Sequence, residues 1–184
     1  MVTGLFASNV YLIVPEGGVE AALIDAGGGV RKVPAYCNKN GLELKYIILT
    51  HRHWDHTMAA RRLRRATGAT VLTSSLDSKT KKPFSEGGCA LEEGDRIALG
   101  NLSLKVISTP GHTPGGITLA LDNSLFTGDT LFANGVGRTD LKGGDYQVLM
   151  NSLRRLFKFP DKTIVYPGHG PNTTIGKEKY LLNF

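Results

Sequence analysis

The sequence predicts an α/β fold in which mixed β-sheets are covered by helices. Strand, helix and strand alternate through the first half of the chain, and two short hairpins follow in the middle. Hydrophobic residues make up 41% and charged residues 21%, a balance typical of a chain that buries a core. A length of 184 residues suits one compact domain, so we assign residues 1–184 to a single domain.

The first elements predicted are two strands. Residues 9–14 and 20–25 are apolar and partly β-branched, and Pro15-Glu16-Gly17-Gly18 between them is typical of a hairpin turn. Residues 30–40 have a mixed pattern that predicts a helix, and the apolar run 46–49 predicts a buried strand after it. This order indicates a βαβ unit.

A second helix is predicted over residues 57–67 and a further strand over 70–73. The apolar face of this helix is expected to consist of Met58, Ala59, Leu63 and Ala66. Four arginines lie between these positions, and we interpret them as the solvated face: Arg61, Arg62, Arg64 and Arg65.

Two hairpins and a second helical region complete the prediction. The hairpin strands are residues 95–99 with 102–107, and 117–121 with 124–126. Residues 146–159 have apolar residues at helical spacing up to Pro160, residues 163–166 predict the final strand, and a last helix begins at Thr174.

The sequence contains no recognisable export or membrane segment. No apolar run approaches the roughly 20 residues that span a bilayer, and the start has no basic region or cleavage site. Cys37 and Cys89 form no CxxC pair, which argues against a disulfide framework and against a thiolate zinc site. We therefore expect a cytoplasmic protein without a membrane partner.

The net charge of +6 favours an anionic ligand but does not choose one. The arginine-rich helix has no interleaved aromatic residues on which bases would stack. We therefore expect a small anionic substrate and no nucleic acid. A nuclease or phosphodiesterase activity is a weaker possibility, since only the positive net charge supports it.

The strongest chemical signal is His51-Arg52-His53-Trp54-Asp55-His56, directly after a buried run. Imidazole nitrogen and carboxylate oxygen are the ligands that zinc and similar divalent metals prefer. Adjacent side chains diverge, so the spacing sends His51 and His53 to one ion and Asp55 and His56 to another. The motif predicts a dinuclear site, and a second role of Asp55 as a helix N-cap is compatible with it.

Three further candidates lie in loops that follow predicted strands. His112 and His169 lie in loops rich in glycine and proline, and Asp129 ends a strand at Thr127-Gly128-Asp129-Thr130. A lone histidine is more often a core or surface residue, but loops at one sheet edge bring distant residues together. The complete set of predicted metal ligands is His51, His53, Asp55, His56, His112, Asp129 and His169.

These motifs resemble the metallo-β-lactamase superfamily and, within it, a compact single-domain form of the glyoxalase II (hydroxyacylglutathione hydrolase) branch. The matching segments are residues 9–12, 23–27, 50–56, 109–113, 126–132 and 166–170. The resemblance implies an αββα four-layer sandwich with the metal site at one edge of its two sheets. It also implies two divalent ions, most often zinc, with iron or manganese accepted. The ligands it implies are His51, His53 and His112 for one ion, Asp55, His56 and His169 for the other, and Asp129 as the bridge.

The resemblance implies a hydrolase that cleaves hydroxyacyl-glutathione or a similar anionic thioester. A hydroxide that bridges the metals would attack the carbonyl carbon, and the catalytic role of Asp55 would be to orient it. Such enzymes often have a tyrosine directly after the last histidine ligand, where it contacts glutathione. In this sequence that position is Gly170, followed by Pro171, so the tyrosine contact is missing.

Gly135-Val136-Gly137-Arg138-Thr139-Asp140 is similar to a segment of compact relatives and of persulfide dioxygenases. Arg138 is a candidate for binding a substrate carboxylate, and the alternative is that it pairs with Asp140 to brace the loop. The second functional hypothesis is a persulfide dioxygenase with one Fe(II) on His51, His112 and Asp129. A metal-binding scaffold without activity is the least favoured hypothesis.

Overall fold

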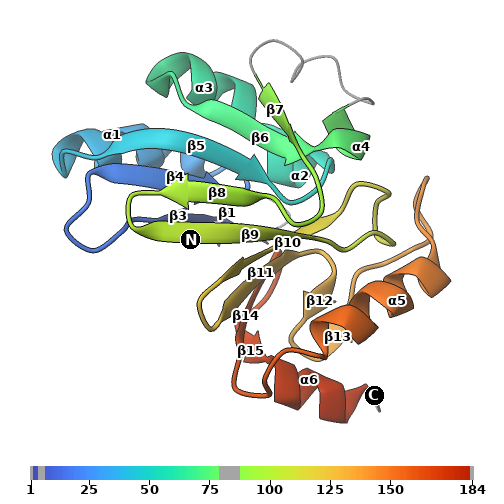
Figure 1. Cartoon of the computed structure of the whole chain (residues 1–184). Coiled ribbons are helices and arrows are strands. Elements are labelled where there is room, and N and C mark those ends of the chain that lie inside the picture. The colour runs from blue at the N-terminus through green and yellow to red at the C-terminus, as the bar shows by residue number, and fades with distance from the viewer. Residues whose placement is uncertain (1, 4–6, 79–87, 183–184) are drawn as a thin grey trace.

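The computed structural model describes residues 2–3, 7–78 and 88–182 of the chain (Figure 1). Two β-sheets pack face to face, and helices cover the outer face of each sheet. The predicted αββα four-layer sandwich is confirmed. No helix in the described ranges is both long enough and apolar enough to cross a lipid bilayer.

The first sheet has five strands in the order β3-β4-β5-β6-β7. Its strands are β3 (Tyr11–Ile13), β4 (Glu20–Ile24), β5 (Glu43–Leu49), β6 (Thr70–Ser74) and β7 (Gly88–Leu91). β3 and β4 form the predicted antiparallel hairpin, and the remaining pairs are parallel. Parallel neighbours need crossover connections, which contain η1 (Val30–Lys32), α1 (Val33–Lys39), α2 (Trp54–Thr57), α3 (Ala60–Thr67) and α4 (Ser75–Ser78).

The second sheet has six strands in the order β15-β14-β11-β10-β9-β8. Its strands are β8 (Arg96–Leu99), β9 (Leu102–Ser108), β10 (Ile117–Leu121), β11 (Ser124–Gly128), β14 (Ile164–Pro167) and β15 (Thr173–Thr174). The helices on its outer face are α5 (Tyr146–Leu156) and α6 (Ile175–Leu181). Two small ribbons complete the fold: β1 (Val2–Thr3) with β2 (Ser8–Asn9), and β12 (Leu131–Phe132) with β13 (Gly135–Val136).

The strand pattern explains why the sheets are covered on both sides. Successive side chains of a strand point to opposite faces. In β4, Ala21 and Leu23 pack under α1 and α3, whereas Ala22 and Ile24 pack between the two sheets. Because both faces of this strand are buried, its sequence is a continuous apolar run rather than an alternating one.

The layered architecture gathers several strand exits at one edge. β4, β5 and β6 are parallel, so their carboxyl ends lie together at one edge of the first sheet. β11 and β14 are also parallel, so their carboxyl ends lie together in the second sheet. A hydrogen bond from Ile117 N to Thr50 O links the start of β10 to the residue after β5. The loops that carry the predicted metal ligands therefore share one end of the sandwich.

The helix predicted over 57–67 differs from the structure. It is divided into α2 and α3 by Met58 and Ala59. Met58 and Ala66 are exposed, so their assignment to the apolar face was wrong, while Leu63 is buried as predicted. The physical reason is that His56 is drawn into the protein, and the helical period from it buries the residues four and seven positions later.

Several shorter differences concern element ends. The predicted helix over 146–159 ends at Leu156, and the strand at 163–166 is not the last one, because the two-residue strand β15 pairs with β14 after it. Strand β7 and helix α4 were not predicted. Neither four-residue element is long enough to show a periodic pattern.

Leu119→Ala is expected to lower the free energy of unfolding by about 3 kcal/mol, because Leu119 is fully buried between the sheets and its removal leaves a cavity. Urea titration measures this change. Leu181→Ala removes the same atoms from a side chain that is 47% exposed and should cost less than about 1 kcal/mol. Equal losses in the two variants would contradict the assignment of the inter-sheet core.

Candidate metal centre

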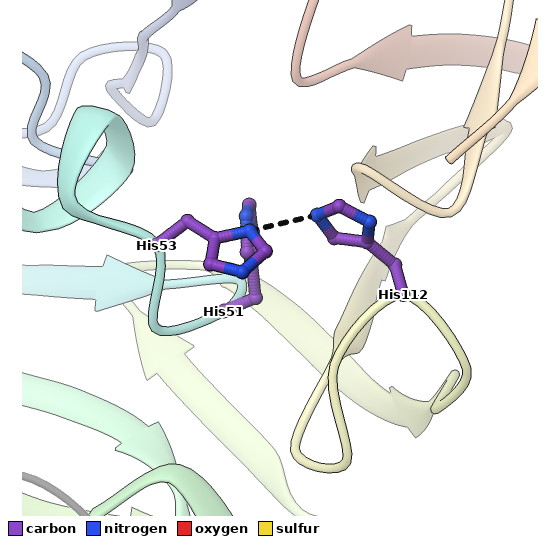
Figure 2. Close-up of side chains that lie close together, drawn as sticks. All are labelled: His51, His53 and His112. Carbon is purple, nitrogen blue, oxygen red and sulfur yellow. Dashed lines mark hydrogen bonds between the residues drawn. The ribbon is translucent and has the colours of Figure 1, made fainter. Parts of the chain in front are cut away.

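The first donor group consists of His51, His53 and His112 (Figure 2). His51 and His53 follow the end of β5, and His112 comes from the loop between β9 and β10. Nδ1 of His53 lies 2.9 Å from Nε2 of His112. One nitrogen of each of the three rings lies within 4.8 Å of the others, so the three imidazoles can converge on one ion.

The second donor group consists of Asp55, His56 and His169. The first two lie on α2, and His169 lies just after β14. Nε2 of His56 lies 3.1 Å from Nε2 of His169, and Oδ2 of Asp55 lies 3.4 Å and 3.3 Å from these two nitrogens. Asp55 and His56 thus lie in one group, as the spacing of the motif predicts, and His56 also forms a possible donor set with His51 and Asp129.

Asp129 lies between the two groups, just after β11. Its Oδ2 lies 3.5 Å from Nε2 of His112 in the first group and 3.5 Å from Nε2 of His169 in the second. Its Oδ1 lies 3.4 Å from Nε2 of His56, and Oδ2 lies 3.9 Å from Nε2 of His51. The structure thus brings all seven predicted ligands together, with one carboxylate in contact range of both groups.

Two buried polar atoms of this cluster are free to bind a metal ion. Nε2 of His51 and Oδ1 of Asp129 are buried, and neither has a hydrogen-bond partner among the described residues. Buried polar atoms without partners cost free energy. A set of imidazole nitrogens and carboxylate oxygens suits zinc, iron or manganese, so the residues present fit divalent ions.

A carboxylate outside the predicted ligand set orients two of the histidines. Asp25 is buried, and its Oδ2 accepts a hydrogen bond from Nδ1 of His56 at 2.8 Å. Its carboxylate also accepts from the backbone N of Thr50 at 2.8 Å and from the Thr50 hydroxyl at 2.9 Å. That hydroxyl lies 3.1 Å from Nδ1 of His51. Both histidines therefore direct Nε2 toward the cluster.

Asp25 was not predicted as a site residue, although a signal for it existed. It is a carboxylate at the end of a buried strand, directly beside the strand that leads to the His51 motif. Its backbone has a φ of 60°, a left-handed conformation that aspartate tolerates better than most residues.

Backbone and amide groups hold the remaining loops. The Arg138 carbonyl accepts a hydrogen bond from Nδ1 of His112 at 2.6 Å. The Asn9 side chain donates to the carbonyls of Pro167 and Gly170 at 3.0 Å and 2.8 Å, on both sides of His169. The hydroxyl of Ser8 donates to the Asp55 carbonyl at 2.9 Å. Strand β2 therefore holds both the start of α2 and the His169 loop, which carry the second donor group.

A glycine is required beside the shared carboxylate. A Cβ atom at Gly168 would collide with the Asp129 carboxylate and would press on the His56 ring. The Gly168 N–H also donates to the Gly128 carbonyl at 2.7 Å, which joins the ends of β11 and β14. The glycine before the last histidine is thus set by close approach.

The surroundings of the first donor group and of Asp129 keep these side chains in the protonation states that bind a metal. Burial, with the neighbouring His56 second, holds the pKa of His51 well below its ordinary value, and burial lowers the pKa of His53 to about 4. These imidazoles are therefore neutral at pH 7. Burial acts to raise the pKa of Asp129, but a hydrogen bond from His169 and the charges of nearby imidazoles keep it well below its ordinary value.

In the second donor group, nearby carboxylates outweigh burial and raise the pKa values of both histidines. Burial opposes a charge on His56, but the Asp25 carboxylate outweighs it and raises the pKa of His56 well above its ordinary value. Hydrogen bonds to Asp129 and Asp55 raise the pKa of His169 to about 9. An ion bound by these rings would displace their protons, because only the neutral imidazole coordinates a metal.

Two predictions about single residues are settled differently. Asp55 lies in the first turn of α2, and the N-cap position belongs to His53, so the alternative role of Asp55 as an N-cap was wrong. The guanidinium of Arg138 donates two hydrogen bonds to the Asp140 carboxylate at 2.7 Å and 2.6 Å, and both side chains are more than 60% exposed. This pair matches the loop-bracing alternative, and a substrate contact of Arg138 stays a prediction.

Asp25→Asn is expected to weaken binding of the ion held by His56 by about 10- to 100-fold, because loss of the acceptor charge releases the ring from its orientation. Asparagine tolerates the same backbone conformation, so the fold should be kept. Competition with a chromophoric chelator measures the affinity. Asp122→Asn, on the exposed β10–β11 turn, is the matched control. Unchanged affinity in Asp25→Asn would contradict the orienting role.

Several known proteins are similar to this chain in sequence and in fold. Hydroxyacylglutathione hydrolase GloC from Haemophilus influenzae is 35% identical over 95% of this chain and 91% of its own length. The crystal structure of TTHA1623 in a di-iron-bound form has a TM-score of 0.86 and 34% identity over 97% of this chain and 95% of that one. ETHE1 from Myxococcus xanthus has a TM-score of 0.84 and 36% identity over 95% of this chain and 77% of that one.

A comparison with family models identifies the family to which these proteins and this chain are related. Residues 3–169 match the model of the metallo-beta-lactamase superfamily, which includes every predicted metal ligand. The superfamily binds divalent metals, in agreement with the donor groups found at the sheet edge. The match covers far more than half of the chain, and the chain therefore belongs to the metallo-beta-lactamase superfamily.

Proposed function

We propose that this protein is a metal-dependent thioester hydrolase that cleaves hydroxyacyl-glutathione or a similar small anionic thioester. The observation that carries the proposal is the position of Asp129, whose carboxylate lies 3.5 Å from imidazole nitrogens of both donor groups. A carboxylate shared in this way is suited to bridging two ions. Two divalent ions, when bound, supply a hydroxide near neutral pH and polarise a carbonyl group.

Asp55 is the proposed catalytic residue. Burial acts to raise its pKa, but hydrogen bonds from His169 and His56 keep the pKa far below its ordinary value, so the carboxylate is ionised at pH 7. An ionised carboxylate at this position accepts a hydrogen bond from the attacking oxygen and orients it toward the thioester carbonyl. The thiolate leaves without a strong acid, because thiols have pKa values of about 8.5.

Similarity to a named hydrolase supports this choice of reaction. The name of GloC specifies hydroxyacylglutathione as its substrate, and the two chains align over nearly their full lengths. The residues of both donor groups are complete in this chain. Since neither half of the site has lost a donor, the arrangement favours a reaction that uses two ions.

A second candidate uses only part of the cluster. His51 and His112 lie 3.9 Å and 3.5 Å from Oδ2 of Asp129, which is a set of two histidines and one carboxylate. Such a set suits a single Fe(II) in an oxygenase. Oxygen uptake with glutathione persulfide and the Fe(II)-loaded protein would favour this persulfide dioxygenase over the hydrolase.

The test of the proposed function is hydrolysis of S-D-lactoylglutathione, followed through the loss of thioester absorbance. The metal-loaded protein should turn over the substrate, and a sample treated with a chelator should not. Elemental analysis of the same samples gives the number of ions per chain. A protein shown to hold two ions but inactive on this and other thioesters would overturn the proposal.

Asp129→Asn is expected to reduce the metal content below two ions per chain and to lower kcat/KM at least about 100-fold, because it removes the charge shared by both ions. Elemental analysis and thioester hydrolysis measure the two effects on one preparation. Asp140→Asn removes an exposed carboxylate outside both donor groups and should keep both ions. Full metal content together with full activity in Asp129→Asn would refute the shared role.

A further inference from the structure

An exposed stripe runs from the metal centre along α2 and α3. Trp54 and Met58 are 50% and 53% exposed, and three exposed arginines continue the stripe: Arg61, Arg62 and Arg65. The intervals of four, three or four, and then three or four residues place these side chains on one helix face. Met58 and Ala59 both have right-handed helical backbone angles, so the face continues from α2 into α3.

The stripe begins at Trp54, next to the predicted catalytic residue Asp55 in the chain, and leads away from the metal centre. Figure 1 shows α2 at the end of the sheet where β5 and β6 finish, with α3 lying back over the sheet. With a rise of 1.5 Å per residue, Arg61 lies roughly 9 Å and Arg65 roughly 15 Å along the helix from Asp55. Positive charge is thus presented at a defined separation from the reacting centre.

These arginines are available for an anionic ligand. Within the described part of the chain, no carboxylate forms an ion pair with Arg61, Arg62 or Arg65, whereas Arg138 and Arg155 are each paired with a neighbouring acidic residue. A guanidinium group matches phosphate oxygens by paired hydrogen bonds. Three such groups on neighbouring helical turns suit a ligand with several phosphate groups.

A groove beside the stripe is suited to an aromatic ring. It has a volume of about 150 Å³ and lies between the start of α1 and α3, with Arg62 joining it to the stripe. The residues that line it are Val30, Pro34, Ala59, Arg62, Leu63 and Ala66. Apolar walls next to a guanidinium group are complementary to a flat base that carries phosphates.

We propose that the thiol half of the substrate is coenzyme A, with its phosphates on Arg61, Arg62 and Arg65 and its adenine in the groove. This inference rests on the proposed thioester hydrolysis. The arm between sulfur and phosphate contains two amide units and spans roughly 15 Å when extended, which matches the separation of the arginines from Asp55. The glutathione carboxylates lie within roughly 8 Å of its sulfur and do not reach Arg65.

The reaction is an ordinary hydrolysis and needs no further reactant. The oxygen of one water molecule bonds to the carbonyl carbon, the carbon–sulfur bond breaks, and its electron pair leaves with sulfur. One water proton ends on the thiol and the other is released from the carboxylic acid at neutral pH. The phosphates lie far from these atoms and bind equally well before and during the reaction, so their contacts should appear in KM rather than in kcat.

The kinetic test combines two substrates with two variants. The substrates are lactoyl-coenzyme A and lactoyl-pantetheine, which lacks the nucleotide. In the triple variant Arg61→Gln, Arg62→Gln, Arg65→Gln, KM for the coenzyme A thioester should rise about tenfold while kcat stays within about twofold. The pantetheine thioester should be unaffected. The matched control is the variant Arg96→Gln, Lys105→Gln, Lys177→Gln, which removes the same charge from exposed positions of the other half of the sandwich.

A binding measurement separates this inference from the proposed function. Desulfo-coenzyme A has no thiol to bind a metal, and calorimetry should detect its binding to the metal-free wild type and to the control variant, but about tenfold weaker binding to the triple arginine variant. Equal binding by all three proteins, or equal KM values for both thioesters in the wild type, would overturn the coenzyme A site. If desulfo-coenzyme A binds as expected but no thioester is hydrolysed, the proposed function fails while the nucleotide site stands.

Discussion

The organisation of the metal centre depends on one buried carboxylate. Asp25 sits where β4 ends and accepts hydrogen bonds from the residue after β5 and from a histidine on α2. A buried charge is expensive unless it is fully hydrogen-bonded, and here each bond fixes a different segment of the chain. The same contacts that stabilise the carboxylate therefore orient His56 directly and His51 through Thr50.

Much of the fold and most of the candidate site could be predicted from the sequence, because both depend on local patterns. The hairpin of β8 and β9 and that of β10 and β11 join apolar runs across two-residue turns, which fixes their pairing within a few residues. The His51 motif carries its ligand types at a spacing that already divides them between two groups. Their convergence with Asp129 follows from where strands end in a layered sheet.

Features that need three-dimensional information could not be predicted. The orienting contact of Asp25 spans 31 positions, and the contact of Asn9 with the His169 loop spans more than 150. Neither residue has a local pattern that identifies its partner. The prediction of the buried face of α2 and α3 was wrong for the same reason. The inward position of His56 depends on its hydrogen bond to Asp25 and not on the apolar residues of the helix itself.

The hydrogen bonds of Ser8 and Asn9 have a consequence for how such a centre can change over time. They attach helix α2, which carries Asp55, and the His169 loop to strand β2, whereas His112 is attached to the carbonyl of Arg138 in the second half of the chain. Strand β2 thus supports the second donor group in particular, although Asp25 orients one histidine of each group and Asp129 lies between them. Inherited changes at Ser8 or Asn9 therefore act first on the half that contains His169, so a single scaffold can diverge toward one-ion or two-ion chemistry without rebuilding its core.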